Sequence, residues 1–197
     1  SDTGRVYGLK KNSAIEQWTY RTGGAIRGNP AVQGANVFFT SSDGAVYRFS
    51  SATPGWVTGT SWQFLSGSRI VSDPVVYSRW VFAGSTDYKL YCLEATDGTE
   101  FWAFQAEAPI ETTPVVYSHR SNQEFVYCIA VERTGRQVTR TLFSVKLRDG
   151  TEVWRFPGIR KVVSMGKRNL YAMTDPDSGS GKFLVALDVM SGKEQFK

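Results

Sequence analysis

The amino-acid sequence predicts an all-β chain built from repeated units of four antiparallel strands. Aromatic residues make up 14% of the chain, glycines number 19, and short bursts of Val, Phe and Tyr alternate with turn-forming residues. β-Branched and aromatic side chains favour pleated, half-buried strands. The i, i+3, i+4, i+7 apolar spacing of an amphipathic helix is not sustained anywhere. At 197 residues the chain has the length of one domain, so we expect 1–197 to form a single domain.

One column of aromatic or apolar residues repeats along the whole chain. Its members, at intervals of 40, 44, 52 and 42 residues, are Tyr7, Tyr47, Tyr91, Phe143 and Val185. A second apolar position follows each of them by two residues, at Leu9, Phe49, Leu93, Val145 and Leu187. Residues two apart on a strand point to the same face, so each pair predicts the buried face of one strand.

A hairpin and a large aromatic ring follow the column in most units. Turn-forming pairs stand where two strands must reverse, at Asp97-Gly98, Asp149-Gly150 and Ser191-Gly192. Glycine is favoured there because it accepts a positive φ without steric cost. The ring comes eleven residues after the column, at Trp18, Trp102, Trp154 and Phe196. In the second unit the gap is fifteen residues, reaching Trp62 across the inserted segment 54–56.

Two further strands complete each unit. The first is short, and in three units it begins after a proline, at Pro30, Pro74 and Pro114, a position that suits proline because it need not donate a hydrogen bond there. In the fourth case the segment 161–164 predicts a shortened strand without proline. The second is expected at 37–40, 81–84, 125–131 and 170–174.

Four strands in about 40 to 50 residues are typical of a β-propeller blade, because such a sheet buries both faces only against neighbouring sheets. We expect the blades to span 1–22 as a partial blade, then 23–66, 67–106, 107–158 and 159–197.

The sequence from Tyr91 to Trp102, Tyr-Cys-Leu-Glu-Ala-Thr-Asp-Gly-Thr-Glu-Phe-Trp, followed by Pro114-Val-Val, resembles the repeat of the pyrroloquinoline-quinone-type (PQQ-like) propeller family. Segments 144–154 and 185–196 repeat the pattern, so the resemblance covers nearly the whole chain. It implies that the tryptophans dock one blade on the next. It also implies a periplasmic or secreted location and a likeness to non-catalytic members, such as the propeller lipoproteins of outer-membrane assembly.

The first residues of the chain match the interior of later units, as 1–9 and 42–49 show. We therefore expect the chain to begin in mid-blade and to end, at Lys197, where a further blade would begin. This gives about four and a half blades, whereas the resemblance implies about seven or eight for a closed ring. The prediction is an open or partial propeller with exposed edge strands, through which two copies would pair as a homodimer.

Composition favours a protein partner over nucleic acid or a membrane. The net charge is +5 and the pI about 9.2, yet the 23 Lys and Arg residues are scattered, so an acidic protein partner is expected and no nucleic acid. No stretch is long and apolar enough to span a membrane. Cys92 and Cys128 lie between apolar neighbours in strand-like runs. They are interpreted as reduced and buried, with a disulfide as the alternative.

No residues match a catalytic, cofactor or metal site. The single histidine, His119, stands in a polar loop, and the Asp-rich stretch 175–181 has Ala186 where a calcium-binding loop needs Glu. Quinoprotein dehydrogenases, which the repeat resembles, hold their quinone and calcium with adjacent cysteines and an aspartate base, and nothing here matches that set. We expect no cofactor.

Two groups of charged residues are the candidate partner-binding sites. The first aligns beside the isoleucine that enters each blade and would lie near the mouth of the central funnel: Arg27, Arg69, Glu111, Arg160 and Lys161. The second lies on an insertion, 132–140, that lengthens a hairpin and carries Arg133, Arg136 and Arg140. Convergent cations bind acidic groups. The alternative for both groups is that they are separate solvated charges.

The expected function is therefore a non-catalytic protein-interaction or scaffolding propeller that presents loops and edge strands to partners. Two alternatives stay open. In one, the chain is part of an enzyme or sensor whose active residues lie outside it. In the other, it is a carbohydrate-binding propeller that uses Trp56 and Trp80, which stand outside the repeated tryptophan column.

Overall fold

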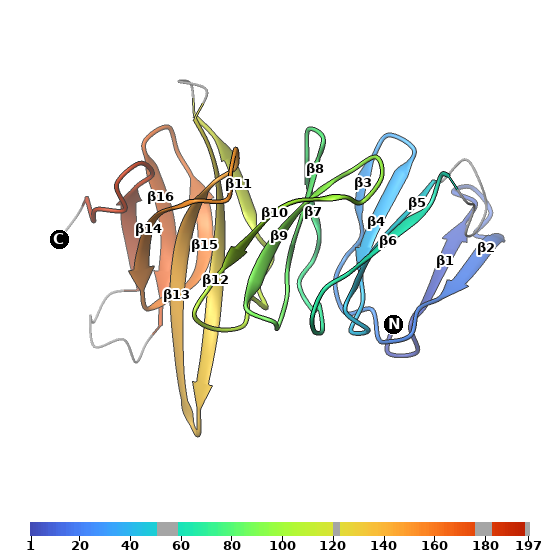
Figure 1. Ribbon diagram of the computed structural model, residues 1–197, viewed down its shortest axis with the longest axis horizontal. Helices are drawn as coiled ribbons and strands as arrows, with labels where there is room; N and C mark the ends of the chain where they lie inside the picture. The colour runs from blue at the N-terminus through green and yellow to red at the C-terminus, as the bar shows by residue number, and fades with distance from the viewer. Residues whose placement is uncertain (51–58, 120–122, 176–182, 196–197) are drawn as a thin grey trace.

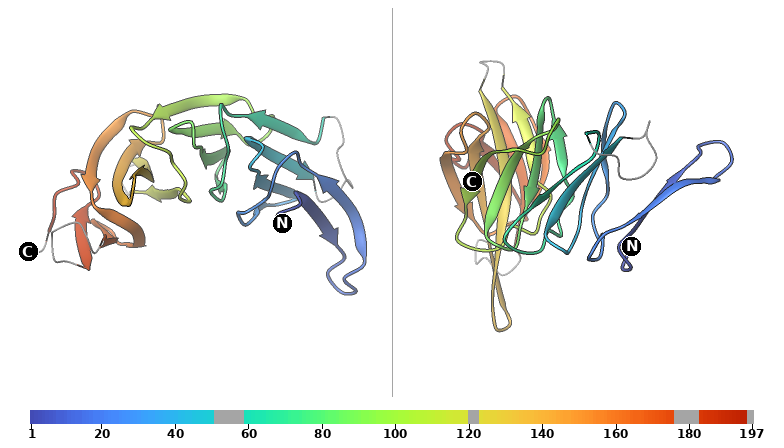
Figure 2. Two further views of the ribbon diagram at one scale, coloured as in Figure 1. Left: turned by 90° about the horizontal axis from the view of Figure 1, so that it is seen from below. Right: turned by 45° about the vertical axis from the view of Figure 1, so that its right-hand side comes forward.

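The computed structural model describes residues 1–50, 59–119, 123–175 and 183–195. This part of the chain contains seventeen β-strands in five antiparallel sheets, and no helix. The sheets stand side by side along an open arc, with the first and last sheets at opposite ends (Figures 1 and 2). The all-β class and the partial propeller predicted from the sequence are confirmed.

Each sheet follows chain order from strand to strand. The first sheet has two strands, β1 (Arg5–Leu9) and β2 (Glu16–Arg21). The second has β3 (Ala31–Gln33), β4 (Asn36–Thr40), β5 (Ala45–Ser50) and β6 (Trp62–Leu65). The third has β7 (Val75–Tyr77), β8 (Trp80–Gly84), β9 (Lys89–Glu94) and β10 (Glu100–Gln105). The fourth has β11 (Val115–Ser118), β12 (Glu124–Thr134), β13 (Gln137–Lys146) and β14 (Glu152–Pro157). The last has β15 (Ile159–Met165), β16 (Asn169–Thr174) and β17 (Leu184–Asp188).

The hydrophobic cores lie between successive sheets. The core between the third and fourth sheets, for example, joins Phe82, Cys92 and Trp102 to Val126 and Phe143. The repeated column faces these junctions in every sheet after the first, where its residues are at most 4% exposed. Burial of both faces of each central sheet by its neighbours explains why the units stack as blades.

The tryptophan column docks each blade on the next, as the resemblance implies. The indole Nε1–H groups donate to backbone carbonyls of the following sheet, in the pairs Trp62 to Ala95 (3.1 Å), Trp102 to Leu147 (2.8 Å) and Trp154 to Val189 (3.1 Å). The turn glycines Gly98, Gly150 and Gly192, all at positive φ, lie against these rings. Trp18 packs edge-on against Phe49 of the second sheet. Phe196 lies outside the described residues.

One strand departs from its predicted length. Segment 161–164 is not a shortened strand: β15 spans seven residues, Ile159–Met165, whereas β3, β7 and β11 span three, three and four. Without a proline every residue keeps its N–H, so β15 pairs with β16 along its whole length, with two register shifts. The last sheet has three strands in the described residues, and its fourth appears only as a bridge between Leu187 and Glu194.

Candidate partner-binding surface

A long hairpin projects from the fourth sheet. Strands β12 and β13 pair in unbroken register from Phe125 and Lys146 out to Thr134 and Gln137, and Gly135 turns the chain with a φ of 63°. Figure 1 shows this hairpin reaching well beyond the neighbouring strands. Its outer part, 132–139, is exposed. The insertion predicted from the sequence therefore lengthens both strands. Their backbone pairing continues without interruption to the end of the hairpin.

Two of the three hairpin arginines are paired with carboxylates from other segments. Nη2 of Arg133 lies 2.7 Å from Oε2 of Glu111, a contact that joins the two predicted charge groups. Nη1 of Arg140 lies 2.5 Å from Oδ1 of Asp175, at the end of β16. Arg136, beside the turn, is exposed and forms no ion pair with any residue that the structure describes. Of the three hairpin arginines, Arg136 is thus the one that remains available to a partner.

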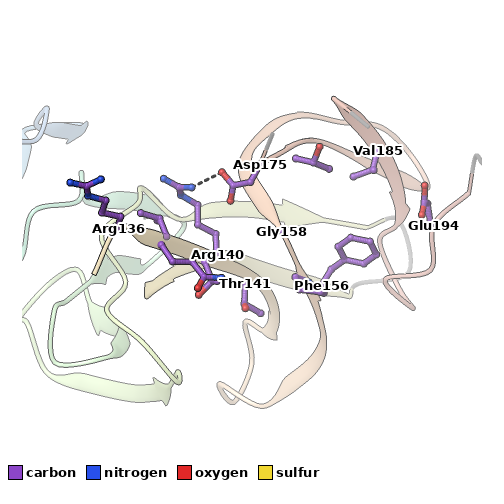
Figure 3. A pocket seen from close by; sticks show the side chains of 13 residues that line it. Arg136, Arg140, Thr141, Phe156, Gly158, Asp175, Val185 and Glu194 are labelled. Carbon is purple, nitrogen blue, oxygen red and sulfur yellow. Dashed lines mark hydrogen bonds and ion pairs between the residues drawn. The ribbon is translucent and has the colours of Figure 1, made fainter. Parts of the chain in front are cut away.

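A cleft of about 740 Å³ opens beside the Arg140–Asp175 pair. Figure 3 shows the residues of its walls. They come from β13, from the end of β14, and from the last sheet, where the end of β16, β17 and Glu194 contribute. Phe156, Val185 and Glu194 lie at one end of the cleft, and Arg136 lies at the other. Oδ2 of Asp175 is buried and has no hydrogen-bond partner among the described residues. The cleft therefore combines apolar contact area with charges of both signs.

The residues predicted near the funnel mouth have different partners in the part of the chain that the structure describes. Arg27 pairs with Asp2 at 3.4 Å, and both side chains are exposed. Arg69 is exposed, and its carbonyl accepts a hydrogen bond from Thr86 N at 2.9 Å.

Arg160 and Lys161, both exposed on β15, share a second groove of about 400 Å³ with Thr112 and Ile129. The structure thus brings Glu111 to Arg133, and it places the sequence neighbours Arg160 and Lys161 at one groove. Within the described residues it forms no ion pair between Arg27 or Arg69 and the other members of the two groups.

Asp175 and Glu194 line the cleft, yet the sequence pattern did not single them out as partner-binding residues. Asp175 lies 35 residues from Arg140, and the two meet only because the fourth and last sheets pack side by side. The aspartate directly follows β16, so the strand pattern places it at a blade rim, but no spacing shows which arginine it faces.

The two cysteines are buried, and the histidine lies beside a tyrosine. Cys92 and Cys128 are free and buried, and burial raises the pKa of both thiols. The ring of His119 lies 6.3 Å from that of Tyr117. The described residues contain no group of three or more His, Cys, Asp or Glu that could hold a metal ion, and no helix that could span a membrane.

Trp80, one of the two predicted carbohydrate-contact residues, is half-buried and packs against neighbouring side chains at the surface. Its ring stacks on Phe101 with centroids 4.2 Å apart, and the guanidinium of Arg79 lies 4.9 Å from the ring centroid. Arg79 is held there by Glu94, at 2.6 Å. Trp56 lies outside the described residues.

Comparison with known proteins places the chain in a family. Residues 55–196 match the family model described as outer membrane protein assembly factor BamB. A curated relative of that name from Nitrosomonas eutropha is 27% identical over 108 residues, which cover 55% of this chain and 25% of the relative.

Solved structures share the fold. The structure of BamB from Moraxella catarrhalis superposes with a TM-score of 0.71 at 15% identity, over all of this chain and 58% of that one. Quinohemoprotein alcohol dehydrogenase from Comamonas testosteroni gives 0.64 at 14% identity, over 87% of this chain and 34% of that one. At these identities the likeness shows the fold alone, and the chain spans only part of each of these proteins. By its repeats, its blade docking and its family match, the chain belongs to the PQQ-like propeller family of outer membrane protein assembly factor BamB.

Proposed function

We propose that the chain is a non-catalytic protein-interaction module that acts as a scaffold in outer-membrane protein assembly, outside the cytoplasm. The observation that carries the proposal is the projecting β12–β13 hairpin, with Arg136 exposed beside its turn and a cleft along its β13 strand. The name of the Nitrosomonas eutropha relative, an outer membrane protein assembly factor, supports the process. Rigid blades that hold exposed loops are a common arrangement for recognition.

The partner is an acidic segment of a protein. Arg136 supplies a cation without a competing carboxylate among the described residues, and the net charge of +5 attracts acidic surfaces at a distance. The apolar part of the cleft, around Phe156 and Val185, would take a side chain of the same segment. Arg160 and Lys161, in the neighbouring groove, extend the basic surface. In this proposal Arg27 and Arg69 do not contact the acidic segment and only attract it from a distance.

The organisation that supports this role is one domain of blades at 1–22, 23–66, 67–106, 107–158 and 159–197. In this proposal the open ends of the arc pair in a homodimer, as expected for exposed sheet ends.

A peptide of alternating Glu and Gly, labelled with fluorescein, tests the binding surface. Its fluorescence anisotropy is measured against the wild-type chain, Arg136→Glu and the matched control Arg148→Glu, which reverses another exposed arginine on a turn of the same blade. We expect Arg136→Glu to weaken binding by about tenfold, and Arg148→Glu to leave it near the wild-type value. Equal losses in both variants, or no saturable binding by the wild-type chain, would overturn the assignment.

A further inference from the structure

A groove of about 480 Å³ on the third sheet is lined by two aromatic rings and several carboxylates. The rings belong to Trp80 on β8 and Phe101 on β10, and they stack with centroids 4.2 Å apart and planes 21° apart. Trp80 is half-buried, whereas Phe101 is 50% exposed. The third sheet packs against the second and the fourth (Figure 2), so this exposure belongs to a blade with both neighbours present.

A β-bulge brings Phe101 into this groove. The register between β9 and β10 shifts between Glu100 and Trp102, so Phe101 is the extra residue of the bulge. In the other units the residue directly before the docking ring is not aromatic: it is Gln17, Ser61, Val153 and Gln195. The blade fold therefore does not require an aromatic ring at this position, and the ring of Phe101 is available for a contact outside the blade.

The groove already holds one cationic side chain of its own. The guanidinium of Arg79 lies 4.9 Å from the centroid of the Trp80 ring. Its Nη2 and Nε donate to Oε2 of Glu94 at 2.6 and 2.8 Å. A guanidinium between a ring and a carboxylate gains a cation–π contact and charge-assisted hydrogen bonds together. The half of the groove around Trp80 thus shows how this surface binds an arginine.

Carboxylates outnumber cations among the residues that line the groove. Glu94, Asp97 and Glu100 line it together with one arginine, Arg79. The N–H of Thr99 donates to Oδ1 of Asp97 at 2.9 Å and lowers the pKa of that carboxyl below its ordinary value, so Asp97 is ionised at neutral pH. The groove is therefore negative, although the chain as a whole has a net charge of +5.

The half of the groove around Phe101 has a carboxylate without a cation. Glu100, next to Phe101, is exposed and forms no ion pair with any residue that the structure describes. Arg48 on β5 reaches the rim, where its Nη1 donates to the carbonyl of Thr96 at 3.4 Å, while its Nε and Nη2 are held by Asn36. The ring of Phe101 and the carboxylate of Glu100 are thus both open to solvent.

We infer that this groove binds a basic segment of a partner protein, with an arginine guanidinium against the ring of Phe101 and Glu100 as its counter-ion. The contact would repeat on the second ring what Arg79, Trp80 and Glu94 form on the first. A guanidinium suits the site better than an ammonium because it is planar, weakly hydrated and stacks on aromatic faces. The inference goes beyond the proposed function, since this site is opposite in charge to the hairpin surface and lies on another sheet.

A fluorescein-labelled peptide of alternating Arg and Gly tests the inference by fluorescence anisotropy. The net charge of +5 repels such a peptide, so saturable binding reports a local site. The wild-type chain is compared with Glu100→Lys and with the matched control Glu16→Lys, which changes an exposed glutamate at the same repeat position, beside Gln17 in place of an aromatic residue. We expect Glu100→Lys to weaken binding by about tenfold. Glu16→Lys should weaken it by less than about twofold, through the added net charge alone.

Phe101→Leu tests the ring separately from the charge. Leucine keeps an apolar side chain against Trp80 but has no π face. We expect the affinity for the arginine peptide to fall by about two- to fivefold, which corresponds to the loss of an exposed cation–π contact. Thermal unfolding, measured on the same sample, should be close to that of the wild type because Phe101 is half exposed.

Equal losses in Glu100→Lys and Glu16→Lys, unchanged binding by Phe101→Leu, or no saturable binding by the wild-type chain would overturn the inference. A neutral glucan oligomer that binds the wild-type chain and not Phe101→Leu, when the arginine peptide binds neither, would overturn it as well and assign the ring to a sugar. Binding of the acidic peptide reads the Arg136 surface separately, so each proposal can fail while the other stands.

Discussion

The indole N–H of Trp102 donates a hydrogen bond of 2.8 Å to the carbonyl of Leu147, a residue 45 positions away in the next blade. The same ring lies against Gly150, whose positive φ of 74° turns the chain beneath it. One side chain thus satisfies a backbone carbonyl and covers a turn of the neighbouring unit. Two other junctions use the same contact. Adjacent blades are therefore joined by specific contacts as well as by apolar burial.

Replacing Trp102 by Phe should weaken the junction between the third and fourth sheets. The ring is retained in part, but the buried Leu147 carbonyl loses its donor, which costs about 1 to 3 kcal/mol of the free energy of unfolding. Urea unfolding followed by circular dichroism measures the loss, and amide hydrogen exchange in β9 and β13 locates it. Trp80→Phe is the matched control, since Trp80 stacks on Phe101 outside the docking column. Similar losses in the two variants would contradict the docking role.

Gly150→Ala should destabilise the chain more than Gly135→Ala. Both glycines have a positive φ, 74° and 63°, so the backbone strain of an alanine is similar at each, about 1 to 2 kcal/mol. A Cβ on Gly150 would meet the Trp102 ring at 2.8 Å, whereas one on Gly135 meets nothing within 4 Å. The difference in urea midpoint between the two variants isolates the ring contact. Equal midpoints would show that the ring moves aside freely.

The parts of the fold predicted from the sequence are those that recur at fixed offsets. The column at Tyr47 and Tyr91 and the tryptophans at Trp62 and Trp102 are determined by local strand alternation and repeated packing, so one unit indicates the next. The prediction for β15 is wrong in length. The segment lacks the proline that precedes β3, β7 and β11, and without it the strand can pair over more residues.

The candidate site was predicted less completely. The hairpin arginines were found, since an insertion with Arg133 and Arg140 interrupts a regular repeat. Their partners Glu111 and Asp175 come from other segments, and only the packing of strands within and between sheets brings them close. A single sequence contains no periodic signal for such pairs.

The two thiols should be inert in the folded chain. Cys92 and Cys128 are buried in the core between the third and fourth sheets, and burial raises the pKa of each thiol, so little thiolate forms at neutral pH. Titration with an aromatic disulfide reagent should show slow reaction in buffer and rapid reaction of both thiols in denaturant. A fast phase in buffer, at a rate like that of a free thiol, would contradict the packing of this junction.

Stability should depend on pH through the aspartates of the blade turns. At Asp149 the carboxylate accepts hydrogen bonds from the Thr151 hydroxyl at 2.5 Å and the Thr151 N–H at 3.0 Å, and these lower its pKa below the ordinary value of 3.8. A pKa that is lower in the folded chain means that the carboxylate stabilises the fold above pH 3.8, and that this contribution is lost as the pH falls through the folded value. Asp149→Asn should therefore lower the urea midpoint at about pH 7, with the deficit shrinking at about pH 3. Thr151→Val, which removes the hydroxyl donor, should reduce the effect of Asp149→Asn in the double variant. A deficit of the same size at both pH values would show that the asparagine acts through backbone geometry and that the charge of Asp149 contributes nothing to the turn.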